Sequence, residues 1–391
     1  MGLPSALPPG EGVVPGPAPA LPPSEDWELF RIAVSARTEW LVLRVSCEDG
    51  AYGYGECSDA GSLDTVVREL RRFAGPFDPV APSSDGPGDF YARDDFATVT
   101  VRGGVQQARL DRTARRVGVP LRLLLSPQDT LDTFELYANL NRAPGGRAPH
   151  QVAATAEAAV RDGFTAVKLA PFDTPDPTGR HDLARIGLDR VRAVRAAVGD
   201  GIDVMVDAHQ CLTLDELTPL LGPFEDLGLH WLEDGVGIER PGELAELRTR
   251  TELPLAGGEF ARRRSDIHAV RGLLDILLPD VKHAGGPLAV LDLVNQMAFK
   301  ARISLHNPSG PVATLHAAHI APTDPALAER LEYAYGEVSW RADVVHGAER
   351  IHRGRLTVPD APGIGVELDT EHPAVTRVWS GRLEPRPSCC R

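Results

Sequence analysis

A repeating unit of helix followed by strand, which begins at Leu136, constrains the fold of this chain more than any other feature. In each unit an amphipathic stretch leads through a short polar break into a compact apolar run that ends in a polar or charged residue. The paired stretches are 151–163 with 164–169, 183–199 with 202–207, 213–228 with 229–234, 241–251 with 253–259, 265–274 with 275–280, and 287–301 with 302–306. This order predicts parallel strands joined by crossover helices. So many units in one run favour a closed barrel, and an open doubly wound sheet is the alternative.

The residues on either side of the repeat have a different sequence pattern. Three strand-like segments precede two helical stretches, at 27–34, 39–46, 51–56, 65–73 and 105–117, which predicts a small α+β domain. The beginning of the chain is dominated by Pro, Gly and Ala without periodicity, so we expect a disordered leader. Strand and turn patterns return near the end and are expected to pack on the small domain. The predicted division is 1–24 for the leader, 25–135 for the α+β domain, completed by 352–391, and 136–351 for the barrel.

The overall charge limits the partners of the chain. Its 391 residues have a formal net charge of −14 and contain no cluster of Lys and Arg, which argues against nucleic acid and anionic membrane surfaces. No apolar run approaches the roughly 20 residues that span a bilayer, and the N-terminus lacks a basic region followed by a hydrophobic stretch. We therefore expect a cytoplasmic protein.

Acidic residues end three successive apolar runs of the repeat. Asp207, Glu233 and Glu259 follow one another at separations of 26 residues, so their side chains should converge at the carboxyl ends of the strands, where such barrels place active sites. Clustered carboxylates repel one another unless a cation neutralises them, and oxygen ligands suit a hard ion such as Mg²⁺. The three acids are therefore predicted metal ligands. The alternative is that each one only caps the helix after its strand.

The next two runs end in Asp280 and His306, again 26 residues apart. Adjacent strand ends can bring the two side chains into hydrogen-bonding reach, which would orient His306 as a general base; a structural histidine is the alternative. His209 lies two residues after Asp207, on the same side of an extended chain, and could donate a proton to a leaving group or be an exposed loop residue. Lys168, near the end of FTAVKL, lies on the same rim.

The segments that carry these residues resemble, in their order and spacing, the mandelate racemase branch of the enolase superfamily over about residues 25–370. The matching segments are YGYGE, VRGGVQQARLDRTARRVGVPLRLLL, VMVDAHQ, HWLED, LAGGE, LLPDVKHAGG, HNPSGPV, RLEYAYG and PGIGVE. The resemblance implies a modified (β/α)7β TIM-like barrel, which is an α/β fold, with an α+β capping domain. It also implies Mg²⁺ binding and removal of a proton α to a carboxylate. Within the branch, the chain is most similar to acid-sugar dehydratases of the galactonate type.

The resemblance implies a role for each candidate residue. The Mg²⁺ ligands would be Asp207, Glu233 and Glu259. The base would be His306 with Asp280, and the acid for the departing hydroxyl would be His209. Lys168 and Glu332 would contact the substrate carboxylate or the intermediate, with Glu337 as a weaker substitute for Glu332. The expected product is a 2-keto-3-deoxy sugar acid. The resemblance also implies a homo-oligomer.

Two departures from the family pattern affect the expected reaction. Racemases of this branch usually carry a second Lys where this chain has Ala170, so two-base racemisation is not expected, whereas elimination with one base is. A short turn, 35–40, separates the first two strands where relatives have a longer specificity loop.

We therefore expect a Mg²⁺-dependent carbon–oxygen lyase, a hydro-lyase acting on an aldonate or aldarate. The alternatives are an epimerase, racemase or cycloisomerase on a different small carboxylate, in specialised metabolism, and a catalytically retired barrel that serves as a binding or scaffold protein.

Overall fold

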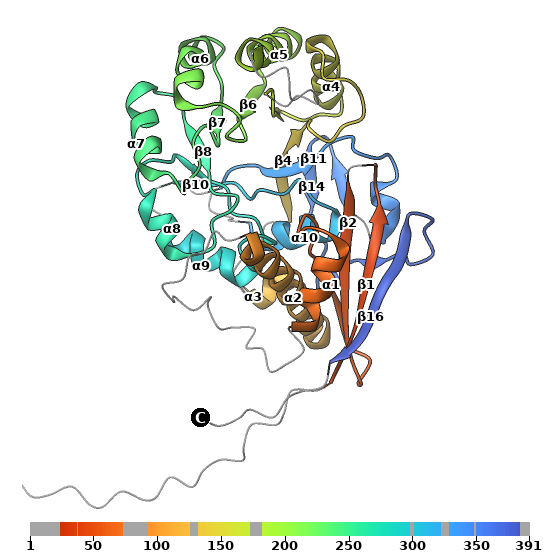
Figure 1. Ribbon diagram of the computed structural model, residues 1–391. Coiled ribbons are helices and arrows are strands. Elements are labelled where there is room, and N and C mark those ends of the chain that lie inside the picture. Colours follow the sequence, from red (N-terminus) through yellow and green to blue (C-terminus); the bar gives the residue numbers. More distant parts are fainter. Residues whose placement is uncertain are drawn as a thin grey trace, which may run out of the picture.

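The computed structural model describes residues 24–36, 38–72, 93–125, 132–172, 182–297, 301–321, 328–347 and 349–383. They form a four-stranded antiparallel sheet with its own helices and a larger, mostly parallel sheet surrounded by helices (Figure 1). The predicted α/β architecture, a modified (β/α)7β barrel with an α+β capping domain, is confirmed. Residues 1–23, most of the predicted leader, lie outside the described residues, and the predicted domain boundaries stay a prediction.

The sheet of the capping domain has the order β16-β1-β2-β3. Its strands are β1 (Glu25–Ala33), β2 (Glu39–Cys47), β3 (Tyr52–Glu56) and β16 (Val375–Leu383). Helix α2 (Arg93–Val117) packs directly on β3 because that strand carries glycine where the two backbones meet. A Cβ at Gly53 would lie 2.3 Å from the carbonyl oxygen of Ala108, so only glycine fits there. Helices α1 (Leu63–Arg72) and α3 (Leu121–Leu125) complete the domain.

The three strands and two helices predicted for this part of the sequence are confirmed, with one difference in length. Helix α2 begins at Arg93, twelve residues before the predicted start at Val105. The stretch FATVTVRGG is rich in β-branched residues and glycine, which have low helix propensity. Packing against the sheet, where Val101 and Val105 are buried with Trp27, overrides that local preference.

Eight strands of the larger sheet form the barrel in the described residues, and they are parallel wherever two of them pair. They are β4 (Thr133–Asn139), β5 (Ala166–Leu169), β6 (Asp203–Asp207), β7 (Trp231–Glu233), β8 (Leu255–Gly257), β9 (Ile276–Leu277), β10 (Arg302–Ile303) and β11 (Leu331–Ala334). The crossover helices are α4 (Pro149–Arg161), α5 (Leu183–Val198), α6 (Leu214–Asp226), α7 (Pro241–Arg250), α8 (Arg264–Ala269), α9 (Pro287–Met297) and α10 (Pro311–Ile320). A bridge between Ile303 and Ala328 connects β10 to the segment before β11, and β11 pairs with β4, so the ring is closed.

The inside of the barrel contains a cluster of buried apolar side chains, which we call the inner layer. It consists of Tyr137, Ala166, Met205, Trp231, Ala256, Ile276 and Leu278. A much larger apolar cluster lies between the outer faces of the strands and the helices. Residues two positions further along a strand point to the same side as the inner layer. The next inward-facing positions therefore lie at the carboxyl end of the barrel, directly above this packed layer.

A buried carboxylate joins the capping domain to the barrel. Glu56, at the end of β3, accepts hydrogen bonds from the backbone N–H groups of Gly310 (2.8 Å) and Ala313 (2.9 Å), at the start of α10. A helix N-terminus favours a negative charge because its first N–H groups lack partners within the helix. Glu56 is fully buried, so this contact fixes the capping domain over the barrel.

The C-terminal part contributes to both sheets. Strands β13 (Arg350–His352) and β14 (Arg355–Thr357) extend the barrel sheet next to β4, whereas β16 pairs with β1. Strands β12 (Val345–His346) and β15 (Glu367–Leu368) form a separate pair, preceded by a short 3-10 helix, η2 (Arg341–Val344). None of the helices in the described ranges has the length and apolar character needed to cross a membrane.

Candidate active site

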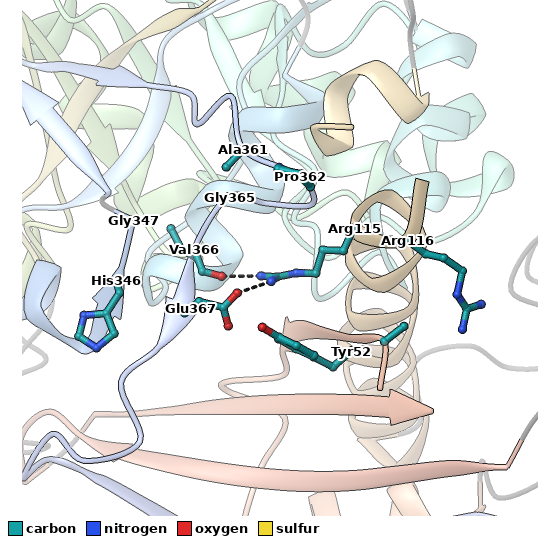
Figure 2. Close-up of a pocket in the computed structure, with 11 residues that line it drawn as sticks. Tyr52, Arg115, Arg116, His346, Gly347, Ala361, Pro362, Gly365, Val366 and Glu367 are labelled. Carbon is teal, nitrogen blue, oxygen red and sulfur yellow. Dashed lines mark hydrogen bonds and ion pairs between the residues drawn. The ribbon is translucent and has the colours of Figure 1, made fainter. Parts of the chain in front are cut away.

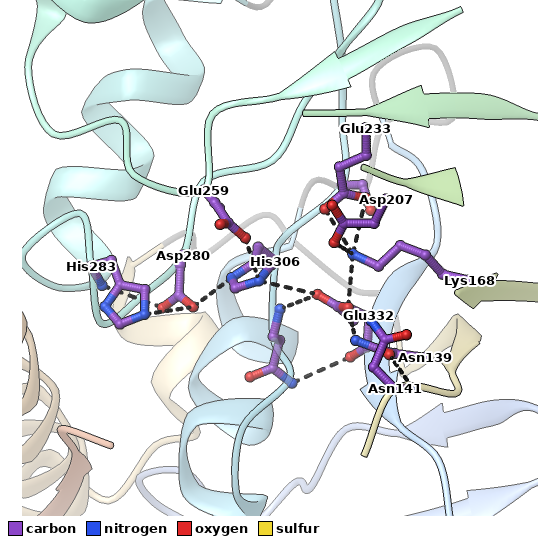
Figure 3. Close-up of polar contacts among 12 residues, drawn as sticks. Asn139, Asn141, Lys168, Asp207, Glu233, Glu259, Asp280, His283, His306 and Glu332 are labelled. Atoms are coloured by element: carbon purple, nitrogen blue, oxygen red, sulfur yellow. Dashed lines mark hydrogen bonds and ion pairs between the residues drawn. The ribbon is translucent and has the colours of Figure 1, made fainter. Parts of the chain in front are cut away.

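Three candidate residues occupy the positions just above the inner layer. Lys168, Asp207 and Glu233 come two residues after Ala166, Met205 and Trp231, on the neighbouring strands β5, β6 and β7. Asp207 and Glu233 are direct partners in the β6–β7 register. The strand period of two therefore explains why these side chains meet at the carboxyl end of the barrel (Figure 3).

Lys168 lies at the centre of the acidic groups. Its Nζ is 2.8 and 2.9 Å from the two carboxylate oxygens of Glu233 and 2.9 Å from Oε1 of Glu332. Asp207 is further away, at 3.8 Å. Burial alone would lower the pKa of Lys168, but the negative charges of Glu233 and Glu332 outweigh it and hold the pKa well above its usual value. Lys168 is therefore a charged donor whose side chain is fully buried.

His306 and Asp280 form the predicted contact. Nδ1 of His306 is 2.9 Å from Oδ2 of Asp280, and Nε2 is 2.7 Å from Oε2 of Glu259. Burial alone would lower the pKa of His306, but Glu259, Glu332 and the hydrogen bonds raise it well above its usual value. Asp280 is fully buried, yet its pKa lies well below the usual range because Lys282, His283 and His306 outweigh the desolvation. The imidazole is thus held at both nitrogens by acidic groups.

His209 lies on the loop after β6 and contacts Asp207. Its Nε2 is 2.7 Å from Oδ2 of Asp207, and its backbone N–H donates to Oδ1 of the same residue at 3.0 Å. The His209 side chain is 38% exposed, whereas that of His306 is 10% exposed. The two predicted catalytic histidines are therefore both beside predicted metal ligands, but in different surroundings.

Glu332 is fully buried within β11 and contacts several partners. Its Oε1 accepts a hydrogen bond from Nδ2 of Asn139 at 2.6 Å, and its Oε2 accepts one from the backbone N–H of Asn307 at 2.7 Å. The predicted weaker substitute, Glu337, lies apart from this network, 3.9 Å from Arg142. The structure thus brings Glu332, and not Glu337, into contact with Lys168.

Sequence reasoning missed several residues of this network. Asn139 ends β4 in the way that Asp207 ends β6, so the strand-end rule could have identified it. Lys282 is fully buried, with its Nζ 3.7 Å from Asp280 and 3.3 Å from Asp59 of the capping domain. Asp59 had no local signal, because its contact with Lys282 joins residues 223 positions apart.

The site contains more acid than its cations neutralise. Burial, followed by the charge of Asp207, raises the pKa of Glu233 to about 8, although Lys168 opposes this shift. Burial and the charges of Glu259 and Asp207 also raise the pKa of the neighbouring Asp234 well above its usual value. Such an excess of buried negative charge favours the binding of a cation.

The predicted ligands are carboxylates, the kind of donor that Mg²⁺ prefers. In the described part of the chain no group of three or more His, Cys, Asp or Glu side chains is arranged to hold a metal ion. Each predicted ligand instead faces a basic partner: Glu233 contacts Lys168, Asp207 contacts His209, and Glu259 contacts His306. The donor set is nevertheless three carboxylates from neighbouring loops and strands with an excess of negative charge, which suits Mg²⁺. The ligand assignment stays a prediction.

Two cavities lie outside this network. One, of about 550 Å³, lies between α2 and the segment before β16 (Figure 2). Its arginines are paired, Arg115 with Asp111 and Glu367, and Arg116 with Asp49. The other, of about 400 Å³, lies beside the short turn between β1 and β2 and reaches Asp59, which contacts Lys282 of the candidate site.

Comparisons with known proteins agree with this architecture. Residues 151–372 match the family described as enolase C-terminal domain-like. The chain is 27% identical over 340 residues to a D-gluconate dehydratase of Thermoproteus tenax, which covers 84% of this chain and 68% of that protein. It is 28% identical over 350 residues to a D-galactonate dehydratase of Ralstonia nicotianae, with coverage of 84% and 89%.

The fold is also similar to that of solved structures. A mandelate racemase/muconate lactonizing enzyme from Jannaschia sp. CCS1 superimposes with a TM-score of 0.75 at 22% identity, and the match covers 88% of this chain and 95% of that one. The resemblance to the mandelate racemase branch of the enolase superfamily, and within it to acid-sugar dehydratases, is confirmed. The matched region is more than half of the chain. The chain therefore belongs to the enolase C-terminal domain-like family.

Proposed function

We propose that this protein is a Mg²⁺-dependent carbon–oxygen lyase that dehydrates an acid sugar to a 2-keto-3-deoxy acid. The observation that carries the proposal is that two histidines each contact a predicted metal ligand, His306 through Glu259, with Asp280 at its other nitrogen, and His209 through Asp207. One group can remove the α proton while the other protonates the leaving hydroxyl. The similarity to named gluconate and galactonate dehydratases supports the same reaction class.

In this proposal His306 is the base. A hydrogen bond from its Nδ1 to Asp280 orients the ring, and its Nε2, which here lies 2.7 Å from Glu259, would take the proton from the carbon next to the substrate carboxylate when Glu259 binds Mg²⁺ instead. Asp280 is fully buried and keeps its charge, so it stabilises the imidazolium that forms. Lys168 and Glu332 would bind and orient the substrate carboxylate. Asp207, Glu233 and Glu259 would hold Mg²⁺, which supplies charge stabilisation for an enediolate.

His209 completes the elimination. Its Nε2 donates a proton to the hydroxyl on the adjacent carbon as that C–O bond breaks, and the departing group leaves as water. The electron pair of the former C–H bond forms the new C=C bond. The resulting enol becomes the 2-keto acid when its C3 carbon takes up a proton from solvent and its hydroxyl group gives one up to solvent. The chain supplies the acceptor of the α proton, His306, and the donor to the leaving hydroxyl, His209.

Elimination fits this site better than racemisation. The backbone of Ala170 donates its N–H to Oδ1 of Asn141 at 2.6 Å, and its carbonyl oxygen accepts from Arg147. Its methyl side chain cannot accept a proton, so Ala170 cannot act as a second base at this position. This leaves His306 as the base that acts on the α carbon.

The rest of the substrate is proposed to be polyhydroxylated. The cavity of about 400 Å³ near Asp59 is lined largely by polar side chains, among them Ser35, Thr38 and Glu39. Hydroxyl groups can donate to these carboxylates and exchange hydrogen bonds with these hydroxyls, whereas an apolar chain offers no polar group to them. We further propose that the protein acts in the cytoplasm as a homo-oligomer and has no nucleic-acid or membrane partners. Light scattering would give the number of subunits.

A screen of aldonates and aldarates tests the function. The purified protein with Mg²⁺ is expected to form a 2-keto acid from at least one compound of the library, detected by semicarbazide absorbance. Chelation with EDTA should abolish the activity, and added Mg²⁺ should restore it. A complete library without a product would contradict the proposal, and activity that persists in EDTA would contradict its metal dependence.

A further inference from the structure

The loop that carries His209 has an unusual backbone. His209 and Gln210 are consecutive residues with φ of 45° and 52°, in the left-handed region that non-glycine residues rarely adopt. Asp234, on the loop after β7, has φ of 43°. Within the described ranges only two other non-glycine residues, Asp59 and Arg353, have positive φ. Such conformations persist only where surrounding contacts impose them, and they concentrate at functional positions.

Backbone hydrogen bonds join the two loops beyond the ends of their strands. The N–H of Ala208 donates to the carbonyl of Glu233 at 2.8 Å, and the N–H of Gln210 donates to the carbonyl of Asp234 at 2.9 Å. The N–H of Cys211 then turns back to the carbonyl of Ala208 at 2.8 Å. His209 therefore lies at the tip of a tight turn that is fixed on both sides.

The side chain of Gln210 provides a second attachment. Its Oε1 accepts a hydrogen bond from Nη2 of Arg240 at 3.1 Å. Arg240 is itself held to helix α7, because its Nη1 donates to Glu243 at 2.7 Å. The loop after β7 also makes room for the amide: a Cβ at Gly237 would lie 2.4 Å from Nε2 of Gln210. The amide is thus enclosed by the loop after β7 and tied to α7.

We infer that Gln210 is a positioning residue that, through Arg240, fixes the direction of the His209 imidazole for protonation of the leaving group. The inference rests on the proposed function of His209. A half-exposed imidazole on a free loop would sample many directions, and proton donation in the elimination requires one. Proton abstraction by His306 does not involve this loop, so the two partial reactions should respond differently.

The test compares elimination with α-proton exchange in D₂O for a hit substrate. Gln210→Gly and Arg240→Met are expected to lower the ratio of elimination to exchange at least fivefold, and Arg240→Lys, which keeps a donor, should retain most of the wild-type ratio. The control is Arg353→Gly, which removes a left-handed residue of φ 50° on the turn between β13 and β14 and should leave the ratio unchanged. A wild-type ratio in both Gln210→Gly and Arg240→Met would overturn the inference.

A second readout separates this inference from the proposed function. In protein with labelled histidine, the His209 imidazole signal is identified by its loss in His209→Asn. Arg240→Met is expected to move this signal toward that of a free histidine, whereas Arg353→Gly should not. An unchanged signal would overturn the positioning role even if no substrate is found. Conversely, a library without hits together with a shifted signal would reject the proposed reaction and keep the positioning role.

Discussion

The two sides of the candidate site hold their histidines in different ways. His306 is buried and contacts Asp280 and Glu259, and Asp280 is in turn held by Lys282 and, through it, by Asp59 of the capping domain. His209 is more exposed, and a strained turn holds it in place. The side of the site around His306, the base side, therefore depends on buried charge and on docking of the capping domain. The side around His209, the acid side, depends on local backbone geometry. Removal of groups from the base side should affect both stability and the first chemical step.

The largest effect is expected for His306→Asn. Asparagine cannot take a proton, so both α-proton exchange and elimination should fall at least about 1,000-fold, within the range of general-base contributions. Exchange is measured by NMR in D₂O and elimination by formation of the 2-keto acid. Exchange near the wild-type rate in this variant would show that another residue is the base.

Lys282→Met should reveal the role of buried charge on the base side. The fully buried Nζ lies between Asp59 and Asp280, so its loss removes a buried cation from both carboxylates and should lower the free energy of unfolding by about 3 kcal/mol. Denaturation in urea measures this change. The matched variant on the acid side is Arg240→Met, which removes a partly exposed cation and should cost less than about 1 kcal/mol. Equal losses in the two variants would contradict the proposed difference.

A smaller effect is expected from His283, also on the base side. Burial lowers the pKa of His283 to about 4, although Asp280 opposes the shift. Its stabilising contribution is therefore complete above pH 6.5, the value for the unfolded chain, and is lost as the pH falls toward 4. At pH 5 the loss should be about 2 kcal/mol. His283→Gln should flatten the dependence of unfolding free energy on pH between 7 and 5 by that amount; an unchanged slope would contradict this assignment.

The barrel could be predicted from the sequence because its rules are local. The alternation of helix and strand identified the units, and the strand period of two explains why Asp207, Glu233 and Lys168 share one face. The same rule would have found Asn139. These predictions needed only the position of a residue relative to the end of its own strand.

The contacts between the domains could not be predicted in this way. Glu56 reaches the start of α10 across 254 positions, and Asp59 reaches Lys282 across 223. Neither acid differs in its local pattern from an ordinary exposed residue. The early start of α2 was missed for a related reason, because its helical conformation depends on packing against Gly53 and Gly55 rather than on its own propensity.

The most direct test of the account is one NMR experiment in D₂O on His209→Asn with a substrate that the wild-type protein dehydrates. If His209 is the acid and His306 the base, deuterium still enters the α position within about threefold of the wild-type rate, while 2-keto acid formation falls about 100-fold. This result would place the base on the His306 side and the acid on the His209 side. Parallel loss of exchange and elimination, or elimination at the wild-type rate, would contradict the division of labour between the two histidines.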